Sequence, residues 1–167
     1  MLESGHGKKK GAVHMDKAMI LVIDGCAPEY LTRETAPDIY KLADEYGFAK
    51  IVKSAIPSVT NVNHACILSG KFPEDTKMVG NYFYNPETKE EGFIEEKGFM
   101  KAETILQAYK KEGKKTAFLT VKGKVLGVYG EGVDIGISVQ TPDKAILDQL
   151  GLDMPPKVQD HSSTEWI

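Results

Sequence analysis

The chain has 167 residues, which is enough for one ordinary domain with a hydrophobic core. It is 41% hydrophobic and 27% charged, which indicates a folded globular protein rather than a disordered one. The formal net charge is −3, and the densest basic run, residues 8–10, lies in a polar N-terminal stretch. This composition argues against nucleic-acid binding, which needs a basic face.

The first 55 residues contain two predicted strands and one helix. Residues 1–17 form a Gly-, Lys- and His-rich tail without periodicity. Residues 18–23 are a continuous apolar run, typical of a strand buried on both faces of a parallel sheet. Residues 36–47 are predicted to be a helix, because apolar residues recur at helical spacing and a glycine stands at the end. Residues 48–55 are a second strand candidate.

The rest of the chain continues this alternation. Helices are predicted over residues 60–69 and 103–112, and extended segments over residues 78–84, 116–121 and 133–139. Strands alternating with helices in this way predict an α/β fold with a largely parallel sheet. The last stretch, residues 153–167, is Pro-rich and then polar, which indicates a loop.

The two cysteines, Cys26 and Cys66, lie far apart, with no CxxC or Cys/His cluster. One disulfide is formally open, but two lone thiols are more typical of a reducing compartment. No stretch approaches the ~20 apolar residues of a membrane span, and no apolar signal-peptide core follows the charged N-terminus. We therefore expect a cytoplasmic protein that does not bind membranes.

Several familiar phosphate and nucleotide motifs are absent. The P-loop fails at Ala65, the near match to GxGxxG fails at Ile135, the second acid of DxD is replaced by Cys26, and there is no GxSxG.

Asp24 directly follows the first predicted strand. Ligands of open α/β sheets bind beyond the carboxyl ends of the strands, so Asp24 is a candidate binding residue. An Asx-turn or a helix N-cap explains an aspartate at this point equally well, and both interpretations stay open.

Thr60 opens the second predicted helix, in the segment Pro-Ser-Val-Thr-Asn-Val-Asn-His. A hydroxyl at a helix start lies among unpaired N–H groups at the positive end of the helix dipole, which favours a nearby phosphate. Taken alone, Thr60 is more simply explained as an ordinary N-cap residue.

Together these features resemble the type I phosphodiesterase and nucleotide-pyrophosphatase branch of the alkaline phosphatase superfamily. The resemblance covers about residues 18–139 and rests on the strand ending in Asp-Gly, the Ala-Pro-Asp-Ile helix and the pattern P-[ST]-x-T-x-x-N-H-x-x-x-x-[ST]-G. It implies that Asp24 binds a metal and that Thr60 is the nucleophile and a metal ligand. It also implies that Asn81, 21 positions after Thr60, binds the phosphoryl oxygens.

Asn63 and His64 belong to the same pattern. We expect them to pack and hydrogen-bond behind the nucleophile helix rather than to bind metal.

Within this branch, phosphonoacetate hydrolases have two lysines, one residue apart, that hold the substrate carboxylate. Lys122 and Lys124 match that pattern and follow a predicted strand, and the intervening Gly123 favours a backbone that turns both cations inward. A solvated lysine turn is the alternative.

The resemblance implies an alkaline-phosphatase-like core with a mostly parallel sheet flanked by helices. Residues 18–152 would form the N-terminal part of the catalytic domain, in a chain that we interpret as truncated. The implied reaction is hydrolysis of phosphonoacetate to acetate and phosphate through a phospho-threonine intermediate, with two zinc ions. The alternatives are a phosphodiesterase or nucleotide pyrophosphatase of the same branch, or a catalytically incomplete fragment. A homodimer is left open.

Members of this branch continue well beyond this length, and their other metal ligands lie in that additional part. Of the expected ligands this chain has Asp24 and Thr60, and His161 stands outside any motif of the branch. Two oxygen ligands do not hold zinc tightly. We therefore expect this polypeptide alone to retain zinc weakly and to lack hydrolase activity.

Overall fold

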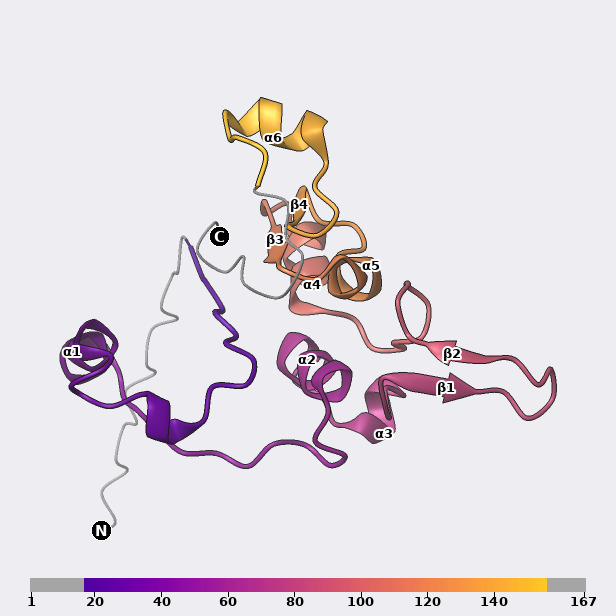
Figure 1. Ribbon diagram of the computed structural model, residues 1–167, viewed down its shortest axis with the longest axis horizontal. Coiled ribbons are helices and arrows are strands. Elements are labelled where there is room, and N and C mark those ends of the chain that lie inside the picture. The colour runs from indigo at the N-terminus through magenta and orange to yellow at the C-terminus, as the bar shows by residue number, and fades with distance from the viewer. Residues whose placement is uncertain (1–16, 156–167) are drawn as a thin grey trace, which may run out of the picture. The chain divides into compact units, whose positions relative to one another are not determined.

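A computed structural model describes residues 17–155, so His161 and most of the predicted tail and C-terminal loop lie outside the described residues. These residues fall into two compact units, with the boundary after Ile51 (Figure 1). The first unit contains η1 (Pro28–Tyr30) and α1 (Pro37–Tyr46). The second contains α2 (Thr60–Ser69), α3 (Pro73–Thr76), β1 (Tyr82–Tyr84), β2 (Glu91–Phe93), α4 (Ile105–Lys111), β3 (Ala117–Thr120), α5 (Gly123–Tyr129), β4 (Ile135–Ser138) and α6 (Lys144–Leu150).

In the first unit, the predicted helix over residues 36–47 is confirmed as α1. Its first residue is Pro37, whose fixed φ and missing N–H suit a helix start. The Arg33 guanidinium pairs with the Asp44 carboxylate on the exposed side of α1 and lies over the Tyr40 ring, 5.0 Å from its centre. None of the α1 residues is buried.

Both strands predicted near the N-terminus are wrong. Residues 18–23 and 48–55 are irregular, and no described strand pairs with them. Their apolar side chains are largely exposed, Met19 to 89% and Val52 to 80%. A strand must pair its N–H and C=O groups with a neighbouring strand. An apolar run without such a partner among the described residues remains outside any sheet.

The second unit is built around a core between α2, α5 and the base of the β1–β2 hairpin. The buried apolar residues of this cluster are Val62, Ala65, Leu68, Met78, Ile94, Val125, Val128 and Tyr129. The prediction for α2 is confirmed at both ends, and Gly70 closes the helix with a left-handed φ of 66°. The core thus fixes the helix that begins at Thr60.

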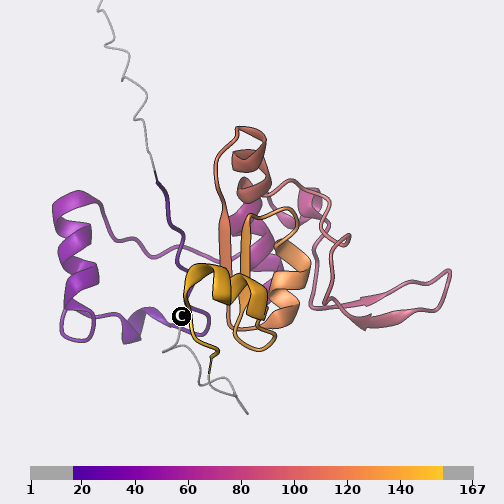
Figure 2. The same cartoon turned by 90° about the horizontal axis from the view of Figure 1, so that it is seen from above.

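A β3–α5–β4 unit forms the parallel part of the fold. The strands β3 and β4 pair in parallel, with Ala117 opposite Ile135 and Thr120 opposite Ser138. Helix α5 connects them and lies against both strands, while α6 contacts β4 (Figure 2). The extended segments predicted at 116–121 and 133–139 are therefore strands, and the predicted α/β class with a parallel sheet is confirmed. Helices α5 and α6 and the hairpin were not predicted.

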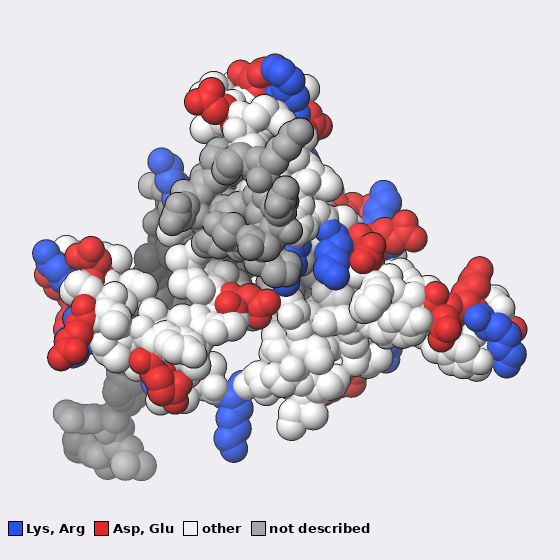
Figure 3. Space-filling view, viewed as in Figure 1, with Lys and Arg blue, Asp and Glu red and all other residues white. Residues whose placement is uncertain are grey.

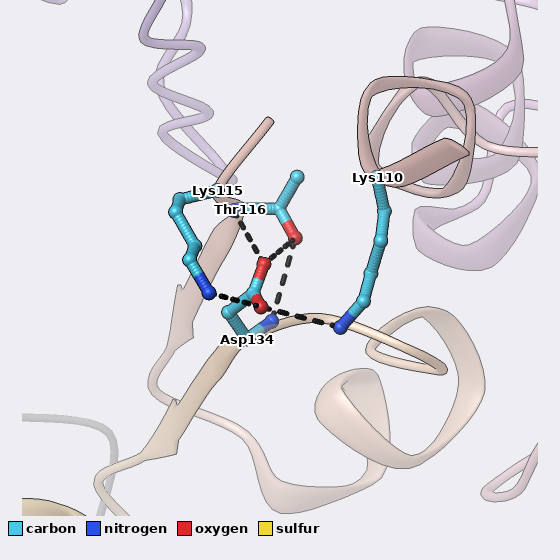
Figure 4. A network of polar contacts seen from close by, with 4 residues as sticks. All are labelled: Lys110, Lys115, Thr116 and Asp134. Carbon is cyan, nitrogen blue, oxygen red and sulfur yellow. Dashed lines mark hydrogen bonds and ion pairs between the residues drawn. The ribbon is translucent and has the colours of Figure 1, made fainter. Parts of the chain in front are cut away.

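One carboxylate joins the starts of β3 and β4. Asp134 accepts a 2.9 Å hydrogen bond from the Thr116 N–H, and its other oxygen lies 3.3 Å from the Lys110 ammonium and 3.4 Å from that of Lys115 (Figure 4). The Thr116 N–H, followed by the two lysines, lowers the pKa of Asp134 to about 2. The carboxylate is therefore ionised at neutral pH and ties α4 to the sheet.

The β1–β2 hairpin projects from the core of the second unit in both views (Figures 1 and 2). Its strands pair antiparallel, with Tyr82 opposite Phe93, and these two rings meet edge-to-face with centres 5.2 Å apart. Charged side chains gather at its tip, whereas the surface along the strands is mostly uncharged (Figure 3). The described helices include none that is long and apolar enough to cross a bilayer.

Candidate active site

Thr60 is the first residue of α2, half-buried, at the end of the helix that faces Asn81. The N-cap residue is Val59, which provides no side-chain cap, so the N-cap interpretation of Thr60 is wrong. The cap comes instead from Asn81, whose Oδ1 accepts the Asn61 N–H at 3.0 Å. An amide side chain from 20 positions away thus takes the place of a local cap.

This hydrogen bond brings Asn81 beside the first turn of α2. With Oδ1 used as the acceptor, its Nδ2 is the donor end of the carboxamide. Thr60 and Asn81, which the family resemblance paired, therefore lie at one helix start. A hydroxyl and an amide donor at the positive end of a helix suit a phosphoryl group.

Asn63 and His64 make the local contacts that were predicted for them. Asn63 accepts the Ala55 N–H at 3.1 Å and donates to the Val59 carbonyl at 3.2 Å, which fixes the chain entering α2. The His64 ring lies with Nδ1 2.9 Å from the Thr60 carbonyl oxygen. Both residues serve the helix backbone in the described structure.

Lys122 and Lys124 follow β3 at the carboxyl end of the parallel strands, as predicted. Lys122 is the N-cap residue of α5, and Lys124 lies in its first turn. Both line an open cleft of about 630 Å³. The cleft is bordered by Glu95, Lys122, Gly123, Lys124, Gln140 and Thr141.

Lys124 already has a carboxylate beside it. Its Nζ lies 3.9 Å from Glu95 Oε1 and 5.5 Å from the centre of the Phe93 ring, and the two charged side chains are 47% and 58% exposed. A half-exposed pair at this distance contributes little to stability. It does show that the Lys124 ammonium is presented to a carboxyl group in this cleft.

Two glycines of α5 allow other groups to approach its backbone closely. A Cβ at Gly123 would lie 2.6 Å from the Thr141 hydroxyl oxygen, and one at Gly127 would lie 2.4 Å from the Glu95 carbonyl oxygen. Gly123 does not have a positive φ, so close approach, rather than the unusual backbone turn suggested by the sequence, requires glycine there. Gly127 lets α5 pack directly on the backbone at the hairpin base.

The hairpin base links the two parts of the site. The Ile94 N–H donates to the Asn81 carbonyl at 2.9 Å. Asn81 thus precedes β1 at the hairpin base, beside α2. Glu95 follows β2 at the same base, beside Lys124. The phosphoryl-binding and carboxylate-binding candidates are carried by one packed unit.

Asp24 belongs to the other unit, in a turn where Gly25 has a φ of 71°. This location agrees with a turn role, and a metal role stays a prediction. Among residues 17–155 there is no group of three His, Cys, Asp or Glu side chains that could hold a metal ion. A catalytic zinc ion usually has three protein ligands.

Sequence reasoning missed three residues that border the cleft, namely Glu95, Gln140 and Thr141. Gln140 also accepts the Gly123 N–H at 3.2 Å. Gln140 and Thr141 lie two and three positions after the end of β4, so the rule that ligands bind beyond strand carboxyl ends indicates their region. Glu95 follows a hairpin that the sequence did not predict, and no sequence signal indicated it.

The chain belongs to the type I phosphodiesterase/nucleotide pyrophosphatase family, whose sequence pattern matches residues 18–165. The family is part of the alkaline phosphatase superfamily of metal-dependent hydrolases, which confirms the resemblance drawn from the motifs.

Two curated relatives carry names of the same kind. An uncharacterised pyrophosphatase/phosphodiesterase of Schizosaccharomyces pombe is 30% identical over 76 residues, which are 46% of this chain and 16% of the relative. An ectonucleotide pyrophosphatase/phosphodiesterase of Caenorhabditis elegans is 34% identical over 97 residues, which are 56% of this chain and 13% of the relative.

Among solved structures, the chain is similar to phosphonoacetate hydrolase from Sinorhizobium meliloti 1021, in complexes with phosphonoacetate and with phosphonoformate. Each match has a TM-score of 0.65 and 31% sequence identity, and covers 80% of this chain. This chain spans 37% of that enzyme's length. The matched fold is alkaline-phosphatase-like.

Proposed function

We propose that this chain is part of a metal-dependent hydrolase that cleaves the C–P bond of phosphonoacetate, giving acetate and phosphate. The observation that carries the proposal is the cleft at the start of α5, where two lysines follow a strand end and Lys124 already has a carboxylate beside it. The structural similarity to phosphonoacetate hydrolase supports the same substrate.

In this proposal Thr60 is the nucleophile and Asn81 binds the phosphoryl oxygens. The Thr60 hydroxyl loses its proton to solvent and its oxygen forms a bond to phosphorus as the C–P bond breaks. The electron pair of that bond remains on the acetate carbon, which then takes a proton from solvent. Water hydrolyses the phospho-threonine, releasing phosphate and restoring the hydroxyl. Asn81 would donate from Nδ2 to the phosphoryl oxygens, since its Oδ1 is used by the Asn61 N–H.

Lys122 and Lys124 would hold the substrate carboxylate. The departing acetate develops enolate character, which places negative charge on its carboxylate oxygens. Two ammonium groups there would stabilise this charge and orient the substrate. Glu95 would have to yield Lys124 to the substrate, and a half-exposed pair is weak enough to allow the exchange.

Two zinc ions are part of the proposal for the complete enzyme. Asp24 and Thr60 are the candidate ligands in this chain, and further ligands would come from residues beyond those described. The cytoplasmic location and the homodimer remain predictions. Cys26 and Cys66 are both free thiols, which is typical of a reducing compartment.

A phosphodiesterase or nucleotide pyrophosphatase is the second candidate, because both curated relatives carry that name. A nucleotide pocket would use aromatic stacking where phosphonoacetate needs a carboxylate clamp. The third possibility, a catalytically incomplete fragment, is separated from both by zinc analysis of the purified chain after dialysis. Near-stoichiometric zinc would contradict it.

The test of specificity replaces both Lys122 and Lys124 with Ala in a polypeptide that carries the full ligand set. Each lost charge-assisted contact should raise the activation free energy of phosphonoacetate cleavage by about 1.5–3 kcal/mol. An aryl phosphate ester without a carboxylate should be cleaved at nearly the parent rate. Equal losses on both substrates would favour the phosphodiesterase function. Lys144→Ala, which breaks an exposed ion pair on α6, is the matched control and should affect neither substrate.

A further inference from the structure

Tyr129 is a buried residue for which the proposed chemistry gives no role. It ends α5, is 2% exposed and belongs to the core shared with α2. Its hydroxyl donates a 2.6 Å hydrogen bond to the Asn61 carbonyl oxygen. Burial, with a smaller contribution from Cys66, raises the pKa of Tyr129 well above its usual value. The hydroxyl therefore keeps its proton, and can donate this hydrogen bond, throughout the pH range in which the protein would work.

The hydrogen bond ends on the residue that follows Thr60. Three residues contact Asn61, one from α5 and two from the hairpin base. Tyr129 donates to its carbonyl, Asn81 accepts its N–H at 3.0 Å, and its own amide donates to the Ile94 carbonyl at 3.5 Å. Asn61 is 7% exposed, so these contacts are shielded from water. The peptide beside Thr60 is thus held by α5 and by the hairpin base together.

The first turn of α2 needs such support. Its N-cap residue, Val59, offers no side-chain cap, so the first turn depends on groups from elsewhere in the chain, of which Asn81 is one. The His64 ring adds a further contact at the Thr60 carbonyl and stacks against the Tyr129 ring, with centres 6.0 Å apart and planes 28° apart. Tyr129 therefore contacts the first turn of α2 through its hydroxyl, and its ring stacks on His64 in the next turn.

Position matters at this point of the chain. A nucleophile displaced by about 1 Å from its line of attack can lose about a hundredfold in rate. Tyr129 lies on the same helix as Lys124, so the contact also sets the nucleophile helix relative to the carboxylate clamp. Bulk packing of α2 on α5 cannot do this alone, because apolar contacts are not directional.

We propose that Tyr129 is a positioning residue, which holds the first turn of α2 through the Asn61 carbonyl and so fixes Thr60 relative to Lys122 and Lys124. The catalytic consequence rests on the proposed function, whereas the restraint on the helix does not.

The test removes one oxygen atom. Tyr129→Phe keeps the ring in the core and deletes the hydrogen bond, and Tyr84→Phe, on an exposed strand residue, is the matched control. Amide hydrogen exchange of this chain should become at least about tenfold faster at Asn61 and His64 and stay unchanged at Leu68, near the other end of α2. Tyr84→Phe should change none of these rates. Unchanged exchange at Asn61, or an equal increase along all of α2, would overturn the proposal.

A second measurement needs no variant and covers the case in which Tyr129→Phe does not fold. In the parent chain, the Tyr129 hydroxyl proton should be protected from exchange and give a nuclear Overhauser contact to Asn61. Its absence would overturn the restraint itself.

The kinetic arm uses a polypeptide with the full ligand set. Tyr129→Phe should lower kcat for phosphonoacetate by about tenfold or more and leave KM within about twofold, since substrate binding by the lysines is retained. A rise in KM with unchanged kcat would overturn the positioning role. Retained turnover in Thr60→Ala would instead count against the proposed function, and the exchange result would still decide the restraint.

Discussion

The two units of the chain differ in what happens to their apolar residues. Residues 18–23 of the first unit are a continuous apolar run that remains irregular and mostly exposed, whereas the apolar residues of α2 and α5 in the second unit are buried against each other. Helix α1 nevertheless forms in the first unit, with none of its residues buried. A helix satisfies its backbone hydrogen bonds within itself, and a strand cannot. The difference shows that an apolar run can be buried, but that a neighbouring strand decides whether it becomes part of a sheet.

The candidate site residues also fall in different units. Thr60, Asn81, Lys122 and Lys124 all lie in the second unit, on elements that share a core or border it. Asp24 lies in the first unit, in a turn that follows an unpaired segment. The residues proposed to contact substrate therefore lie on elements that share or border one core, and the residue proposed to bind metal lies in a turn of the other unit.

The largest expected effect tests whether the second unit carries the nucleophile. In a polypeptide with the full ligand set, Thr60→Ala should lower turnover of phosphonoacetate by more than about a thousandfold, which is ~4 kcal/mol of barrier. Thr60→Ser keeps the hydroxyl and should retain measurable turnover. Steady-state kinetics with released phosphate as the readout checks both variants. Turnover of Thr60→Ala within about tenfold of the parent would remove Thr60 from this role.

The next prediction addresses the comparison directly. In this chain, the backbone amides of residues 18–23 should exchange with solvent at nearly unfolded rates, because no described strand protects them. Those of Ala65 and Leu68 should be slowed on the order of a thousandfold or more by the core. Hydrogen exchange followed by mass spectrometry measures both regions in one experiment. Strong protection of residues 18–23 would mean that the first unit is more ordered than its contacts indicate.

Replacing one glycine in each unit compares how tightly the two units are packed. Gly127→Ala should lower the free energy of unfolding by about 1–3 kcal/mol, because its Cβ would meet the Glu95 carbonyl oxygen at 2.4 Å and that backbone would have to shift. This cost exceeds the stabilisation of at most ~1 kcal/mol that alanine gives over glycine inside a helix. Gly47→Ala in the first unit meets no atom within 4 Å and should be nearly neutral. Urea unfolding curves compare the two, and equal midpoints would contradict the close packing of α5.

The smallest expected effect concerns pH. The folded-state pKa of Asp134 is lowered to about 2, mainly by the Thr116 N–H, so its ionised form stabilises the fold above the ordinary carboxyl pKa of 3.8. This contribution should be lost as the pH falls from about 4 towards 2. Asp134→Asn should therefore unfold at lower urea concentration than the parent at pH 7, and the difference should shrink below pH 4. A difference that stays constant with pH would indicate that the charge is not the cause.

The sequence alone determined the helices that the chain can form by itself and the residues whose spacing matches a family. It predicted α1, α2 and α4, the Gly70 cap, the parallel strands β3 and β4, and the grouping of Thr60 with Asn81 and of Lys122 with Lys124. Periodicity and caps are local properties, and a motif preserves spacing along the chain, so both can be read without coordinates.

Only the tertiary structure decided which apolar runs become strands and which polar groups meet. Residues 18–23 looked like a buried strand, yet strand formation depends on a neighbour that the local sequence does not contain. The bond from Tyr129 to Asn61 spans 68 positions, and the cap that Asn81 provides to α2 spans 20. No local pattern encodes contacts at such separations, because they arise when the core packs α5 and the hairpin base against the start of α2.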